Sequence, residues 1–132
     1  MNRHRFVEHG GEVEVELEAT TEAGLFEAAI EVFAELVSVD TEGPGVRHEI
    51  ELSCVDRALL LADWLNELVY LAEVDQFVPE RLVAFELARD RLRATVVGRR
   101  EHPSHLVKAV TLNSLEYGER EGMWHGRVVL DV

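Results

Sequence analysis

Hydrophobic and polar residues alternate strictly near the start of the chain. From residue 13 to residue 19 apolar side chains take every second position, and glutamates fill the positions between them. A period of two is typical of a strand with one buried and one exposed face. We therefore predict a strand over residues 13–19, preceded at Gly10 and Gly11 by a β-bulge or a close backbone approach.

Two other segments repeat their apolar residues with helical spacing. Residues 22–38 carry Phe26, Ile30 and Phe33 on one side and glutamates on the other, which predicts an amphipathic helix. Residues 58–72 form the most apolar stretch of the chain, and a Ser53-x-x-Asp56 capping box predicts that a second helix opens there.

The remaining segments read as strands and turns. One strand is predicted at residues 46–52, and four more follow the second helix. The latter four are residues 83–88 and 92–98, which form a hairpin, then 108–119 and 123–132. Loops are predicted at residues 41–45, at 75–81 around Pro79, and at the break 102–105.

This order of elements, β-α-β-α-β-β-β-β, predicts the fold class. Helices that come early, followed by a run of strands, are typical of α+β proteins and not of all-parallel folds. We expect a single domain over residues 1–132, in which two amphipathic helices pack on a mainly antiparallel sheet.

Charge narrows the possible partners. The 132 residues carry a formal net charge of −13, which argues against binding nucleic-acid phosphates unaided and against docking on an anionic membrane. An acidic chain of this kind favours binding of cations or of partners with a basic surface. Cys54 is the only cysteine and the first residues show no signal-peptide pattern, so we expect a cytoplasmic protein.

Carboxylates are the candidate chemistry. Asp131 and the terminal carboxylate of Val132 are adjacent, and a third carboxylate from the first predicted strand would complete a hard-oxygen cation site. The residues alone leave open whether this group is simply solvated. Glu14, Glu16 and Glu18 are most simply a solvated strand face.

Five segments together resemble the archease family, the accessory proteins of RtcB-type RNA ligases. They are FVEHGGEVEVELEA near the start, LFEAAIEVFAELV, LADWLNELVYL, VKAVTLNSLEY, and VVLDV at the end. The resemblance implies an α+β protein that binds a divalent cation and is not itself an enzyme. It implies that the protein promotes guanylylation and multiple turnover of the ligase in tRNA splicing or RNA repair, with RNA contacted only indirectly.

The same resemblance assigns residues. It places the ligands for Ca²⁺ or Mg²⁺ at Glu12, Asp131 and Val132. It matches His9 to the histidine of the family's His-Thr-Ala-Asp-Ile-Gly segment and Lys108 to the lysine of its Lys-Ala-Val-Thr segment.

The first motif departs from the family pattern, because Glu12 stands where the family has aspartate. Glutamate is one methylene longer; Ca²⁺ tolerates such a change, whereas Mg²⁺ demands stricter octahedral placement. The site is therefore either retained, with the two glycines accommodating the longer side chain, or lost.

Two other function classes stay open. One is a stand-alone metal-dependent hydrolase that uses Glu12, Asp131 and His9. The other is a cation-binding or oligomeric module without a ligase role. From the residues alone, His9 also suits a polar position near a turn and Lys108 an ordinary surface lysine.

Overall fold

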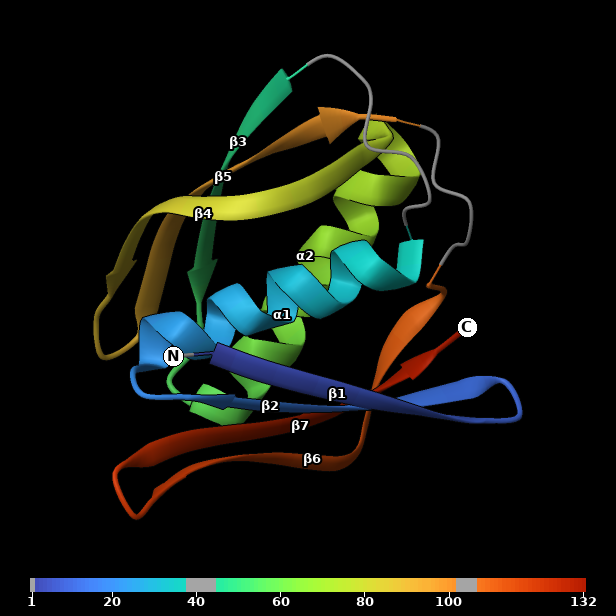
Figure 1. The fold of residues 1–132 in the computed structure, drawn as a ribbon. Coiled ribbons are helices and arrows are strands. Elements are labelled where there is room, and N and C mark those ends of the chain that lie inside the picture. The colour runs from blue at the N-terminus through green and yellow to red at the C-terminus, as the bar shows by residue number, and fades with distance from the viewer. Residues whose placement is uncertain (1, 38–44, 102–106) are drawn as a thin grey trace.

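The computed structural model describes residues 2–37, 45–101 and 107–132, and it places two helices between two antiparallel sheets (Figure 1). The elements are β1 (Asn2–His9), β2 (Glu12–Ala19), α1 (Glu22–Val37), β3 (Gly45–Ser53), α2 (Arg57–Asp75), β4 (Phe77–Leu87), β5 (Arg91–Arg100), β6 (Ala109–Arg120) and β7 (Met123–Asp131). The first sheet has the order β1-β2-β7-β6 and the second has the order β3-β5-β4.

The predicted α+β class and the predicted order of elements are confirmed, with two additions. A further strand, β1, precedes the first predicted one, and the strands form two sheets in place of a single sheet. The sequence of β1, NRHRFVEH, does not show the alternation that predicts a strand, because its inward positions carry few apolar side chains and the strand is mostly exposed. Pairing with β2 along its whole length makes it a strand.

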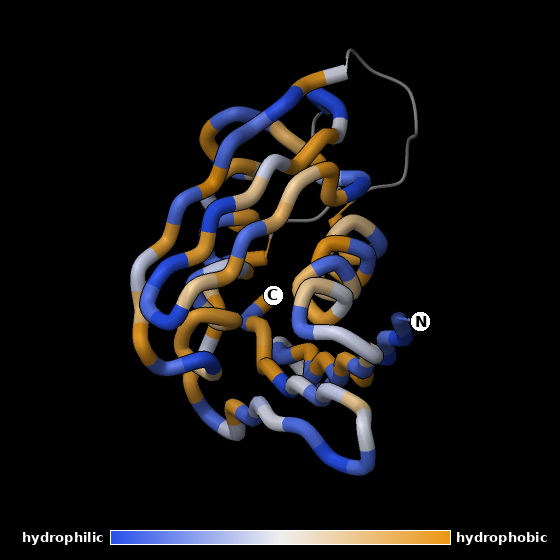
Figure 2. The backbone as a smooth tube through the Cα atoms, turned by 90° about the vertical axis from the view of Figure 1, so that its left-hand side faces the viewer, coloured by the Kyte–Doolittle hydropathy of each residue, from blue (hydrophilic) through white to orange (hydrophobic). Residues whose placement is uncertain are grey.

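Apolar and polar residues alternate along the strands, so the apolar ones gather on the inner face of each sheet. On β2 the inward residues Val13, Val15, Leu17 and Ala19 are each at most 2% exposed. Figure 2 shows the same alternation of hydrophobic and hydrophilic positions along the strands around the helices. Burying a side chain such as valine or leucine contributes roughly 1.5–3 kcal/mol, so this face drives the sheet onto the helices.

The two helices are fixed to each other by an aromatic contact. Trp64 of α2 is fully buried, and its indole Nε1–H donates to the backbone oxygen of Phe26 in α1 at 3.1 Å. The two rings also meet edge to face, with centroids 5.7 Å apart. Neither helix in the described ranges combines the length and hydrophobicity needed to cross a membrane.

Three local predictions are corrected. Gly10 and Gly11 are the two-residue turn between β1 and β2, with φ of +46° and +77°, and not a bulge. Such hairpin turns need positive φ at both positions, which glycine adopts freely. The second helix is capped by Asp56, whose side chain accepts from the Leu59 N–H at 3.1 Å, and not by Ser53.

The predicted loop 75–81 is also wrong, because β4 begins at Phe77 and includes Pro79. This is possible because β4 is an edge strand, where a missing N–H need not break a ladder, and its register shifts just after Pro79. The predicted breaks 41–45 and 102–105 lie outside the described residues, apart from Gly45, which begins β3.

A polar cluster connects the first sheet to both helices. The Tyr117 hydroxyl of β6 donates to Glu22 of α1 at 2.7 Å, and Glu22 lies 3.6 Å from the guanidinium of Arg57 in α2. Arg57 in turn donates to the backbone oxygens of Ala88 and Arg89 between β4 and β5. Burial, reinforced by the hydrogen bond to Glu22, raises the pKa of the Tyr117 phenol far above its ordinary value.

This cluster predicts a pH dependence of stability. The folded protein favours the neutral phenol of Tyr117, so its contribution is intact below the ordinary tyrosine pKa of about 10 and is lost progressively above it. We expect Tyr117→Phe to cost about 1 kcal/mol at neutral pH through the lost hydrogen bond. The variant should then lose less stability than the parent between neutral pH and the alkaline range, measured by urea unfolding. Equal alkaline losses in the two proteins would contradict this.

Candidate functional site

The predicted site residues meet at one end of the first sheet. Glu12 begins β2 and Asp131 ends β7, and the antiparallel register sets their Cα atoms directly opposite each other. On its other side Asp131 pairs with Ala109 at the start of β6. Residues from the two ends of the chain therefore lie on neighbouring strands, close to the β1–β2 turn (Figure 1).

Backbone hydrogen bonds hold the neighbouring residues in place. The Val132 N–H donates to the Gly11 oxygen at 2.9 Å, which ties the last residue to the glycine turn. The Lys108 N–H donates to the Asp131 oxygen at 2.7 Å. Glu12, Asp131, Val132 and Lys108, which the resemblance singled out, are thus brought together by the structure.

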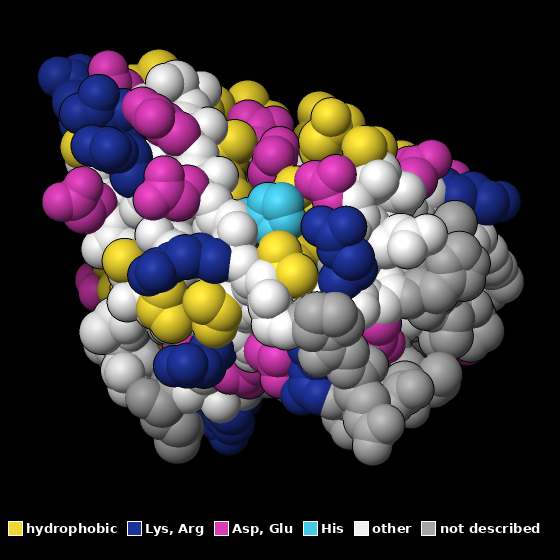
Figure 3. Space-filling model, turned by 90° about the horizontal axis from the view of Figure 1, so that it is seen from above, with side chains coloured by type: hydrophobic (Ala, Val, Ile, Leu, Met, Phe, Trp, Pro, Cys, Tyr) yellow, Lys and Arg dark blue, Asp and Glu magenta, His cyan; other side chains and the backbone are white. Residues whose placement is uncertain are grey.

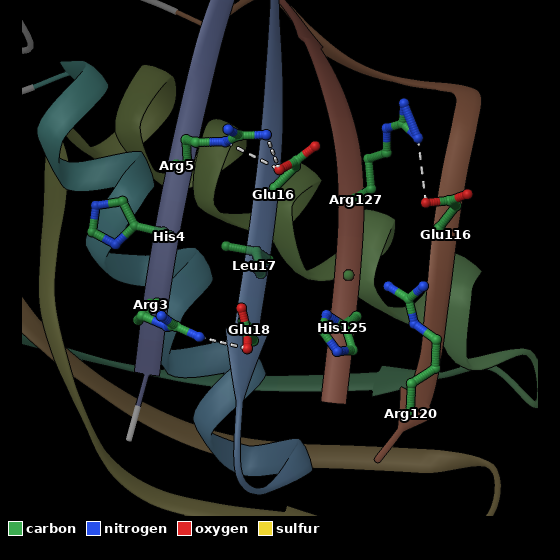
Figure 4. A pocket seen from close by; sticks show the side chains of 11 residues that line it. Arg3, His4, Arg5, Glu16, Leu17, Glu18, Glu116, Arg120, His125 and Arg127 are labelled. Carbon is green, nitrogen blue, oxygen red and sulfur yellow. Dashed lines mark hydrogen bonds and ion pairs between the residues drawn. The ribbon is translucent and has the colours of Figure 1, made fainter. Parts of the chain in front are cut away.

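The other three glutamates of β2 are not a merely solvated face, so that interpretation is corrected. Arginines lie across from them. Glu18 pairs with Arg3 at 2.7 Å and Glu16 with Arg5 at 2.5 Å, both from β1 (Figure 4). Glu14 is paired with Arg127 of β7, which also reaches Glu116 of β6 at 3.3 Å. These carboxylates are balanced by cations on adjacent strands.

Glu12 differs from the three. Within residues 2–37, 45–101 and 107–132, neither its carboxylate nor that of Asp131 has an ion pair or a side-chain hydrogen bond. Like charges directly opposite each other on neighbouring strands are destabilising. A cation bound between the two carboxylates would relieve this repulsion. The Glu12–Asp131 pair is therefore the candidate cation site of this sheet.

His9 and Lys108 border this pair without joining it. His9 pairs in register with Glu12, but its Nε2 lies 3.8 Å from a carboxylate oxygen of Glu14, and the side chain is 62% exposed. Lys108 is exposed, and its ammonium group has no ion pair among the residues that the structure describes.

The donor set fits a hard cation. In the described part of the chain, no three His, Cys, Asp or Glu side chains come together as a metal site. The candidate site therefore has two side-chain carboxylates, from Glu12 and Asp131, and the carboxylate of Val132 as the third group that the resemblance implies. Carboxylate oxygens are typical ligands of Ca²⁺ and Mg²⁺, whereas zinc sites are typically built from thiolate and imidazole groups.

Sequence reasoning missed the arginines that balance β2. Arg3 and Arg5 lie two residues apart and so share one face of a strand, as Glu16 and Glu18 do. This matching period of two was the available signal. It was overlooked because β1 itself was not predicted.

The model of the Archease protein family matches residues 4–132. The chain belongs to the archease family. The archease of Methanosarcina mazei is 30% identical and is aligned over 98% of this chain and 96% of its own length. That of Methanopyrus kandleri is 31% identical over 86% of each chain.

Solved structures have the same fold. The solution structure of protein 1598 of Methanobacterium thermoautotrophicum matches with a TM-score of 0.70 and 25% identity, over 98% of both chains. An archease of Thermotoga maritima, described as a possible chaperone, matches with a TM-score of 0.71 over 96% of this chain and 94% of its own. At 17% identity the latter supports the archease fold alone.

The uncompensated pair predicts the effect of neutral substitutions. Glu12→Gln and Asp131→Asn each remove one of two facing charges at nearly constant shape. Without metal, each should leave the free energy of unfolding unchanged or raise it by up to about 1 kcal/mol, measured by urea unfolding in EDTA. Glu16→Gln is the matched control, since it removes the partner of Arg5 and should bring no gain. A clear loss of stability in both site variants would show that the two carboxylates are not in conflict.

Proposed function

We propose that this protein is a non-enzymatic accessory factor of an RtcB-type RNA ligase. It promotes guanylylation and multiple turnover of the ligase in tRNA splicing or RNA repair, and it acts through a divalent cation, Ca²⁺ or Mg²⁺, at Glu12, Asp131 and Val132. The observation that carries the proposal is the facing Glu12–Asp131 pair, which no described residue compensates, on a strand whose other glutamates are ion-paired. Membership of the archease family supports the proposed ligase partner, which the sequence resemblance implies.

The openness of the site suits transfer of a cation between two proteins. Glu12 is exposed, Asp131 is partly exposed and Val132 is 38% exposed. Ca²⁺ takes six to eight oxygen ligands, and Mg²⁺ keeps several waters, so these three groups leave coordination positions for water or for the partner. A cation held in this way is accessible to a ligase docked at the end of the sheet.

Charge supports a protein partner with a basic surface. The chain carries a net charge of −13, and the face seen in Figure 3 shows basic and acidic side chains interspersed, not a single basic patch. Attraction between opposite net charges speeds association and is screened over about 8 Å at physiological salt. RNA is then contacted only through the ligase.

Lys108 and His9 have positions suited to the partner and not to the cation. Lys108 is exposed beside Asp131, so its ammonium group is available to a carboxylate or phosphate of the ligase complex. His9 lies beside Glu14, next along β2 from Glu12, where it can order the acidic end of the strand.

The alternative of a stand-alone metal-dependent hydrolase has less support from the described residues. Such an enzyme would hold Glu12, Asp131 and His9 in a concave site. Two hollows of the described surface are lined by other side chains, so neither holds Glu12, Asp131 and His9. Turnover of a phosphate ester by the isolated protein would be the sign of that function.

The test adds this protein to the RtcB-type ligase of its own cell and follows guanylylation with GTP and Mn²⁺. We expect sub-stoichiometric amounts to raise the rate or the yield, because an accessory factor leaves after each event. Stimulation should fall as NaCl rises, before the ligase alone loses activity, since the attraction is screened.

Variants separate the site from the docking surface. Asp131→Asn should stimulate poorly while still binding the ligase, because the wider acidic surface is intact. Lys108→Ala should also lose stimulation, whereas Glu16→Gln, altered on the same strand face away from the site, should behave like the parent. Ligase guanylylation and turnover unaltered by the parent protein across metals and salt would refute the proposed function.

A further inference from the structure

We propose a second site, on the outer face of the first sheet, that binds a compact phosphate-bearing anion. This face points away from the helices and contains a hollow of about 400 Å³ lined from all four strands. Figure 4 looks into it, with arginines of β1 on one side and arginines of β6 and β7 on the other. The cation site lies outside it, since neither Glu12 nor Asp131 lines the hollow.

The hollow is rich in arginine although the chain is strongly acidic. Its lining includes four arginines and three glutamates; these are Arg3, Arg5, Arg120 and Arg127 with Glu16, Glu18 and Glu116. His125 also lines it, whereas the ring of His4, another lining residue, is directed to Glu35 of α1. Glu14, which pairs with Arg127 on the same face, brings the glutamates to four, so on a chain of net charge −13 this concave surface carries as many arginines as carboxylates.

The arginines differ in how firmly they are committed. Arg127 is held by two glutamates, whereas Arg3 and Arg5 each contact one exposed or half-exposed glutamate. Exposed ion pairs contribute only about 0–1 kcal/mol, so a ligand can compete for Arg3 or Arg5. The Arg120 side chain has no ion pair or hydrogen bond within the described ranges, so its guanidinium is the one in this hollow that no described carboxylate holds.

Arg120 and His125 form the core of the proposed site. His125 lies on β7 opposite Gly118 of β6, and Arg120 lies two residues further along β6, on the same face. A Cβ added at Gly118 would meet no atom within 4 Å, so the space beside the His125 ring is open. In Figure 4 the guanidinium of Arg120 points into the hollow on the side of His125, whose ring carries an N–H donor at any pH.

This chemistry favours phosphate. Arg120 of β6 and His125 of β7 present N–H donors from two neighbouring strands, which suits the several oxygens of a phosphate group. Arginine also presents several N–H groups in a fixed fork that matches phosphate oxygens. The three glutamates and the net charge of the whole chain oppose a long polyanion, so the ligand is compact, such as pyrophosphate or the phosphates of a nucleotide.

The test measures binding of inorganic pyrophosphate by calorimetry at low salt, without metal. We expect Arg120→Gln to weaken binding by about tenfold, as expected for loss of one charge-assisted contact. Gly118→Leu should block binding while keeping the fold, because the added side chain fills open space. Arg93→Gln is the matched control, since Arg93 is an exposed arginine on the outer face of the other sheet, beside Glu51 and Glu86.

Binding of other ligands identifies the chemical class that the site prefers. A nucleoside triphosphate should bind through the same residues, whereas citrate and a short oligoribonucleotide without terminal phosphates should bind more weakly. Tighter binding of the oligoribonucleotide would overturn the compact-ligand proposal. Pyrophosphate affinity that is unmeasurable, or equal in the parent, Arg120→Gln and Gly118→Leu, would overturn the site itself. Because the assay uses neither metal nor ligase, its outcome is independent of the proposed accessory function.

Discussion

The pairing of β2 with β7 is the constraint on which the rest of the structure depends. These two strands form the centre of the first sheet and come from opposite ends of the sequence; the ion-paired Glu14 and Arg127 are 113 positions apart. Their inner faces supply the valines and leucines that cover the helices, and their register fixes which charges meet on the outer face. A slip by one residue would exchange the two faces, so burial of the inner side determines the charge pattern of the outer one.

That charge pattern divides the outer face into three regions along the strands. In the middle, arginines of β1 and β7 balance Glu14, Glu16 and Glu18. At the end where β2 begins, Glu12 faces Asp131 with no cation from the described residues, and at the other end Arg120 has no described anion. Among the described residues, one end of this sheet therefore has carboxylates without a positive partner and the other end has an arginine without a negative partner, which supports separate cation and anion sites.

The sequence predicts more of the fold than of the site, for physical reasons. Strict alternation on β2 and helical spacing around Phe26 and Trp64 report burial, so those elements were predictable. Strand β1 and the start of β4 were missed because one is mostly exposed and the other contains Pro79, features that local patterns penalise. Glu12 was singled out only through a family resemblance, and its role as a cation ligand stays a prediction. The register that sets it opposite Asp131, and the arginines along the same strands, arise from long-range pairing that no local pattern encodes.

Paramagnetic broadening tests most directly whether a divalent cation binds where Glu12 faces Asp131, as proposed. Small amounts of Mn²⁺, a stand-in for the physiological cation, would be added to ¹⁵N-labelled protein while backbone amide signals are recorded. We predict that the strongest broadening falls on the amides of Gly11, Glu12, Lys108 and Val132, spares the ion-paired stretch around Glu16, and is lost in Asp131→Asn. Broadening centred on another acidic group, such as Glu49 and Glu51 of β3, or unchanged in Asp131→Asn, would contradict the account.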